Sequence, residues 1–299
     1  IPPIYCLFSM EIRNIQKTGD MHYLYLPTSW CREHKIGSKS KVSIDQSSDG
    51  TLSVSPQITE RKPKHLKFNI SEDDQEIIHK LVVACYINPV SSFEINFEKE
   101  LDFTKLLNQK RLISLESVEI DKKQITCHGS ISISDPESLL KTMVRKIKNM
   151  IVVMQKSYDN ELIDRYEDEI DRSKMLIDKS IIGSLAYEKT TKLKTIDLYY
   201  ISLISKDLER MVDHLILVSS KDTEFLDSIY SVVDQLQSLI ENTASLNHKT
   251  ALQFIKKISK IKNLEVKDIK SYDKERVRLS LITISEVITD WAITKEIEK

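Results

Sequence analysis

The sequence is poor in glycine, proline and cysteine, with 5 glycines, 7 prolines and 4 cysteines in 299 residues. Phosphate-binding Walker loops and dinucleotide fingerprints need clustered glycines, and no such cluster occurs. No nucleophile and base stand in a recognisable catalytic motif, so we expect no enzymatic activity. No run approaches the roughly 18 consecutive apolar residues of a transmembrane helix, which argues against direct membrane insertion.

The cysteines are scattered and no C-x-x-C spacing occurs among them; they are Cys6, Cys31, Cys85 and Cys127. This pattern argues against a zinc ribbon and against a disulfide framework, and it is typical of a reducing cytoplasm. We therefore expect a cytoplasmic protein. Residues 1–9 precede Met10 and are interpreted as an N-terminal extension.

Charged residues are abundant, at 30%, and hydrophobic residues reach 40%, which favours a mostly helical chain with two or three domains. The net charge of −1 hides an asymmetry. Residues 10–67 contain ten Lys and Arg against six Asp and Glu, so the rest of the chain is acidic by about five charges. A basic end suggests a polyanionic partner, and an acidic body suggests bound cations.

Residues 10–56 predict a small β domain, with turn signals at 18–20 and 48–50. The expected strands cover 11–16, 22–26, 42–45 and 52–55. One helical turn begins at Pro27 or Thr28. Four short strands and one helical turn cannot bury a core alone, so a partner chain is expected.

Within this domain the runs Arg13-x-x-Gln16-Lys17-Thr18-Gly19, Leu26-Pro27-x-x-Trp30, Val42-x-Ile44 and Asp49-Gly50-x-Leu52-x-Val54 resemble the AbrB/SpoVT/MazE family. The resemblance implies an all-β swapped-hairpin barrel, shared by two chains as a homodimer, that commonly binds DNA. One departure is Lys39-Ser40, where the family usually has glycine before the third strand.

Basic residues of this domain could form a cationic surface doubled by dimer symmetry, and they are Arg13, Lys17, Arg32, Lys35, Lys39 and Lys41. Such a surface would bind duplex DNA with strong salt dependence, because each phosphate contact releases counterions. The alternative is a dimerisation barrel whose lysines are ordinary solvated residues.

Residues 57–134 predict a basic linker followed by a small α/β unit. The expected strands cover 66–70, 93–97, 117–120 and 124–133. One expected helix is capped by Ser71 and runs to residue 87, and a second covers 102–113. The histidines and cysteines of this unit are expected in the core or on the surface rather than as ligands; they are His79, Cys85, Cys127 and His128.

From Asp135-Pro136 onward the pattern stays helical, with Asp135 as N-cap and Pro136 at the first helical position. The expected helices cover 136–158, 160–186, 190–218, 222–244, 248–262 and 273–298. They divide into two three-helix repeats, 135–219 and 220–299.

Carboxylates recur four residues apart on these helices, at Glu167/Asp171, Glu209/Asp213 and Glu286/Asp290. This spacing places both members of a pair on one helix face. Like charges so placed cost an isolated helix a few tenths of a kcal/mol, so something should offset them. Most such pairs are solvated faces beside Lys and Arg, and that alternative stays open. Their recurrence at equivalent places in the two repeats favours a site for a hard cation.

The stretch 160–172 with Leu208-Glu209-Arg210-x-x-Asp213-His214 resembles the PhoU family of phosphate-uptake regulators. The resemblance implies an all-α bundle of two three-helix repeats whose E/D-x-x-x-D pairs bind a metal ion, with iron, zinc, manganese or magnesium as candidates. The family metal positions are Glu167, Asp171, Glu209, Asp213, Glu286 and Asp290, with Asp234 and His214 as weaker candidates. In the second repeat Tyr230 stands where a carboxylate is expected, and Trp291 stands where the first repeat has His214.

The fused order of domains resembles archaeal phosphate-uptake regulators and implies a dimeric, DNA-binding transcriptional regulator whose helical body binds metal or a transport-system partner. A second hypothesis is a PhoU-type interaction protein that binds no DNA and inhibits a phosphate transporter or sensor kinase. A third is metal storage, which predicts several metal ions per chain.

Overall fold

The structure is a computed structural model that describes residues 12–46, 50–56, 65–88, 92–100, 118–128, 135–187, 193–263 and 265–298. The chain divides into two compact units, residues 1–62 and 63–299, and each is described by itself. The expected N-terminal extension (1–9) and the expected helix at 102–113 lie outside the described residues.

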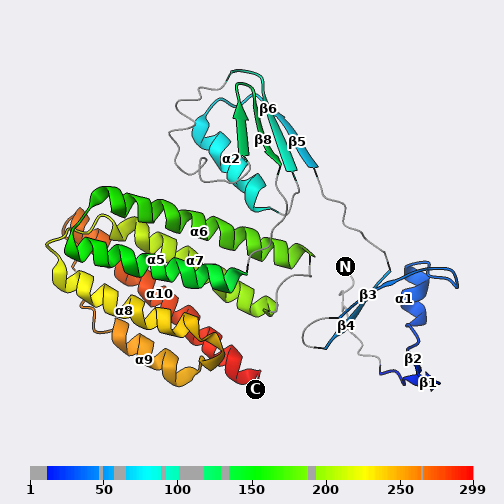
Figure 1. Cartoon of the computed structure of the whole chain (residues 1–299). Helices are drawn as coiled ribbons and strands as arrows, with labels where there is room; N and C mark the ends of the chain where they lie inside the picture. Colours follow the sequence, from blue (N-terminus) through cyan, green and yellow to red (C-terminus); the bar gives the residue numbers. More distant parts are fainter. Residues whose placement is uncertain are drawn as a thin grey trace, which may run out of the picture. The chain divides into compact units, whose positions relative to one another are not determined.

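The N-terminal unit contains two hairpins and one short helix (Figure 1). Strands β1 (Gln16–Thr18) and β2 (Met21–Tyr23) are antiparallel, as are β3 (Ser43–Gln46) and β4 (Leu52–Ser55). Helix α1 (Thr28–Glu33) lies between the hairpins in sequence. The two pairs form separate sheets, and no closed barrel is seen among the described residues of this single chain.

The first hairpin is placed differently from the expectation. Its first strand begins at Gln16, where we expected the strand to end, and pairs Thr18 with Met21. The reason is the two-residue turn: Gly19 has a φ of 62°, which a glycine adopts at little cost, so the chain reverses there.

The C-terminal unit begins with a mixed four-stranded sheet. Its strands are β5 (His65–Ile70), β6 (Ser92–Phe97), β7 (Val118–Asp121) and β8 (Gln124–His128). The order is β5-β6-β8-β7; β5 is parallel to β6 and the other neighbours are antiparallel. Alternate residues of β6, among them Phe93 and Ile95, are buried in a core shared with helix α2.

Helix α2 (Gln75–Ile87) is capped by Asp74, whose carboxylate accepts hydrogen bonds from the backbone N–H groups of Glu76 and Ile77. The expectation of Ser71 as the cap was wrong, because the helix begins only after Asp74, whose backbone is extended.

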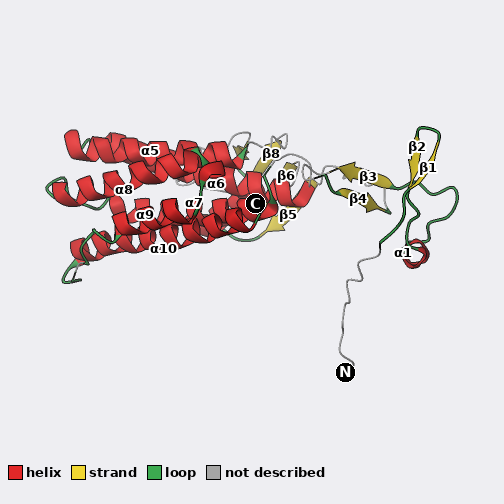
Figure 2. Ribbon diagram, turned by 90° about the horizontal axis from the view of Figure 1, so that it is seen from below, coloured by secondary structure: helices red, strands yellow, loops and turns green. Residues whose placement is uncertain are grey.

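Six α-helices follow in the described chain from residue 135 onward (Figures 1 and 2). They are α5 (Pro136–Lys156), α6 (Asn160–Tyr187), α7 (Thr195–Leu215), α8 (Thr223–Glu241), α9 (His248–Ile258) and α10 (Ile269–Ile297). The predicted cap at Asp135 is confirmed, since its side chain accepts from the N–H groups of Glu137 and Ser138. One continuous apolar core joins all six helices.

The sheet and the bundle meet through α2 and α6. Met175 of α6 is buried in the core of the sheet, and Lys179 lies with its Nζ 3.8 Å from the centre of the Tyr86 ring. Both contacts join elements that are far apart in sequence, so this face of α6 is fixed against the α/β unit.

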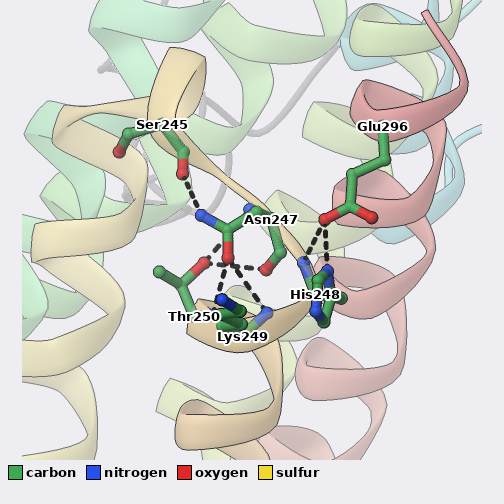
Figure 3. Close-up of polar contacts among 6 residues, drawn as sticks. All are labelled: Ser245, Asn247, His248, Lys249, Thr250 and Glu296. Carbon is green, nitrogen blue, oxygen red and sulfur yellow. Dashed lines mark hydrogen bonds and ion pairs between the residues drawn. The ribbon is translucent and has the colours of Figure 1, made fainter. Parts of the chain in front are cut away.

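Helix α9 is fixed at its first turn (Figure 3). The Asn247 side chain accepts from the N–H groups of Lys249 and Thr250, and Thr250 Oγ1 accepts from the N–H of Asn247, which completes a capping box. Next to it, His248 donates its backbone N–H to Glu296 of α10, and its ring Nδ1 lies 2.5 Å from the same carboxylate. The start of α9 is therefore tied to the last turn of α10. None of the described helices has the length and apolarity needed to cross a membrane.

Candidate metal centre

Three carboxylates from two helices come together on the bundle. Asp171 belongs to α6, and Glu209 and Asp213 belong to α7. One oxygen from each lies within 4.8 Å of the others, and this is the one group of three or more metal-ligating side chains among the described residues. We call these three residues the α6–α7 carboxylate cluster.

The helices place this cluster at the edge of the core. Ile170, Leu208 and Val212 are at most 1% exposed, so they pack inward, and each stands next to a cluster residue in sequence. The carboxylates of the cluster lie within 4.8 Å of one another, so they face the seam between α6 and α7. Asp171 is the buried member, at 7% exposed, while Glu209 and Asp213 reach the surface.

Electrostatics favours a cation at this position. Two carboxylates about 4.8 Å apart repel by ~3 kcal/mol when the effective dielectric constant is about 20, a cost that a bound cation offsets. An all-oxygen donor set suits magnesium, manganese or iron better than a structural zinc. Three protein ligands would leave coordination positions open to water or to phosphate oxygens.

Two other candidates of the first repeat lie outside the cluster. Glu167, one turn before Asp171, is partly exposed and is not one of the three grouped carboxylates. His214 has its Nδ1 2.9 Å from Oδ1 of Asp273, a residue of α10 that is 4% exposed. Its ring also meets Tyr272 edge to face. His214 thus has a structural contact that joins the end of α7 to the start of α10.

The second repeat forms no comparable cluster among the described residues. Glu286 and Asp290 lie on the exposed face of α10. Asp234 of α8 accepts a 2.5 Å hydrogen bond from Lys148 of α5, and this bond raises the pKa of the lysine. Asp234 is therefore half of an ion pair.

Trp291 is a core residue rather than a substitute ligand. It is 1% exposed, and its Nε1 donates a 2.7 Å hydrogen bond to the buried carboxylate of Asp197. The same carboxylate oxygen pairs with Lys295 at 2.7 Å. No sequence spacing connects residues 197 and 291, so sequence reasoning did not find this hydrogen-bond network. The only available signal was an acidic residue, Asp197, at a helix position expected to be buried.

The basic residues expected to bind DNA are all exposed in the N-terminal unit. None of the described residues of that unit is buried, and large apolar side chains lie open on it: Ile12, Ile15, Met21, Tyr23, Leu24, Tyr25, Ile44 and Leu52 are 44–84% exposed. The described residues of this unit thus form no core within a single chain.

Comparison of the chain with protein-family models, with curated proteins and with solved structures gave no match. The two family resemblances therefore depend on the sequence motifs alone.

Proposed function

We propose that this protein is a metal-dependent regulator of phosphate uptake, in which a dimeric N-terminal domain binds DNA and the helical body carries the metal ion. Convergence of the α6–α7 carboxylate cluster is the observation that supports it most, because the three residues were chosen from their spacing and then meet across two helices. The part of the proposal that concerns phosphate uptake is based on the PhoU-like and AbrB-like motifs.

The proposed metal site uses Asp171, Glu209 and Asp213 as ligands. Open coordination positions would let the bound ion take up a phosphate oxygen, so a hard cation there gives the helical body a way to sense phosphate. Magnesium, manganese and iron are the proposed ions.

The open apolar surface of the N-terminal unit supports the dimer. Exposed patches of this kind on a soluble domain mark an interaction surface. Ile44 and Leu52, on paired strands of the second hairpin, are 64% and 62% exposed in the single chain. A second copy that interleaves its hairpins would cover them, and the exposed arginines and lysines would then be doubled on the outside of the dimer.

A gel-shift titration tests the DNA half of the proposal. The full chain is expected to retard duplex DNA from the control region of a phosphate-transport operon, with affinity falling steeply as salt rises. Arg13→Ala/Lys17→Ala should weaken binding, while Lys256→Ala/Lys257→Ala, a matched basic pair on α9, should not. If the wild type binds no duplex at low salt but still dimerises, the PhoU-type interaction protein that acts on a transporter or kinase is the better description.

A further inference from the structure

At both ends of helix α10, polar side chains contact neighbouring helices. Near its start, Asp273 contacts His214 and Lys274 pairs with Asp222. Near its end, three successive polar residues contact other helices: Thr294 contacts Tyr200, Lys295 contacts Asp197, and Glu296 contacts His248 (Figure 3). Most polar groups of these turns therefore contact other helices, while Lys270 is exposed and the His248–Glu296 pair lies at the surface.

The outer face of α10 carries a line of residues spaced alternately by three and four positions. Its members are Ile269, Tyr272, Arg276, Leu279, Thr283, Glu286, Asp290, Ile293 and Ile297. We call this line the α10 seam. All members except the partly exposed Arg276 are exposed, and its five apolar residues are 40–80% exposed. Intervals of three and four are the repeat of a helix that packs against another helix.

Helix α5 of the same bundle shows that exposed apolar residues are not a general property of the bundle surface. The exposed positions of α5 are all polar: Ser138, Thr142, Arg145, Asn149 and Lys156. Such a face is an ordinary solvated one. The α10 seam instead has the composition of an interface that lacks its second helix.

Charge order along the seam identifies that second helix. Thr283 is the centre of the seam, equidistant in sequence from Ile269 and Ile297 at its apolar ends. The basic residue, Arg276, lies before this centre, and the acidic residues lie after it. Two copies placed antiparallel about Thr283 would set Ile269 against Ile297 and Arg276 against Asp290, with Glu286 close by. Parallel copies would set Arg276 against Arg276 and acid against acid, which repels.

Arg276 is the one basic member of the α10 seam and is partly exposed. Its positive charge can therefore pair with a carboxylate of a second molecule, as the antiparallel arrangement requires. We infer that α10 is a self-association surface, on which a second copy of this chain packs antiparallel across a two-fold axis at Thr283.

Cross-linking tests the geometry in the full chain. In a Cys6→Ser/Cys31→Ser background, Thr283→Cys should form a disulfide-linked dimer under mild copper-phenanthroline oxidation, because the two-fold brings position 283 beside its copy. Thr142→Cys on α5 is the matched control, since Thr142 is also exposed in mid-helix and also bonds the carbonyl four residues earlier. Cross-linking at 283 no faster than at 142 would overturn the inference.

A charge exchange tests the pairing itself. Arg276→Glu should slow cross-linking at position 283 several-fold, because acid then faces acid. Adding Glu286→Arg and Asp290→Arg to that variant should restore the wild-type rate, since opposite charges face each other again. Failure of the combined variant to recover, with circular dichroism unchanged, would contradict the antiparallel register.

Discussion

The two three-helix halves of the bundle have the same acidic spacing but different surroundings. In the first half the pair Glu209/Asp213 meets Asp171 across a helix seam. The second-half pair, Glu286/Asp290, faces outward on α10. The residue after each pair also differs: His214 contacts α10 through Asp273, while Trp291 packs in the core and bonds Asp197.

The comparison shows that spacing alone does not define a site. A pair at four-residue spacing always shares a helix face. Whether that face meets a neighbouring helix with a third carboxylate depends on tertiary packing. The first half is therefore proposed for metal, and the second for contact with another copy of the chain.

Core truncations should affect both halves alike and give the largest loss of stability. Leu208 of α7 and Leu281 of α10 are both 0% exposed. Each Leu→Ala change is expected to lower the free energy of unfolding by about 2–5 kcal/mol, from lost burial and a remaining cavity. Leu217→Ala, at a site that is 57% exposed, is the control for chemical denaturation. A loss at either core site no larger than that of Leu217→Ala would contradict the core position of that leucine.

Trp291→Phe removes a contact that the first half lacks. The variant loses the N–H donor to Asp197 and also shrinks a buried ring, while Lys295 still pairs with the acid, so a loss of at least about 1–3 kcal/mol in unfolding free energy is expected. Tyr200→Phe provides the comparison, because it removes only a bond to Thr294. A Trp291→Phe protein as stable as wild type would show that the hydrogen bond has no net value.

Asp207→Asn should stabilise the first half at neutral pH. Burial raises the pKa of Asp207 above its ordinary value of 3.8, despite the opposing effect of Arg210. A raised folded-state pKa means that the protonated form favours folding and that this stability is lost as the pH rises through the folded pKa. The melting temperature of the variant should therefore exceed that of wild type at pH 7, and the gain should vanish below pH 3.8. The corresponding second-half residue is Ile284, which is already apolar.

Lys148→Met should have the smallest effect. Its partner Asp234 is half exposed, and pairs of this kind contribute less than about 1 kcal/mol to stability. Differential scanning calorimetry should show a slight fall in melting temperature, with metal content unchanged. A gain of bound metal in this variant would instead assign Asp234 to a second site.

Sequence patterns predicted much of this fold. Helix positions followed from the apolar period, and the Asp135-Pro136 start was visible because capping is a local property. The mixed sheet and the helical region agree with the expected fold class. The local cap signal failed at Ser71, because Asp74 nearby offers the same cap chemistry, whereas the turn signal at 18–20 was right and only the strand boundaries of the first hairpin differed.

The candidate site was only partly predictable. The pairing of Glu209 with Asp213 follows from helical geometry, but the choice of Asp171 over Glu167 as their neighbour depends on how α6 lies against α7. The exposed face of α10 and the Asp197 network likewise arise from contacts between residues distant in the chain. Periodicity in one helix carries no information about its neighbours.

Metal binding at the α6–α7 carboxylate cluster is the most direct test of the account. Chelator-treated protein should be titrated with Mn²⁺ and with Fe²⁺ under anaerobic conditions, following binding by calorimetry and the melting temperature in parallel. Wild type should bind, and at a hundredfold excess over Kd gain about 2.7 kcal/mol in stability. Glu209→Gln/Asp213→Asn should lose both, and Glu286→Gln/Asp290→Asn should keep both. Absence of binding in wild type, with a higher melting temperature in the Glu209→Gln/Asp213→Asn variant, would contradict the account by showing repelling carboxylates and no metal.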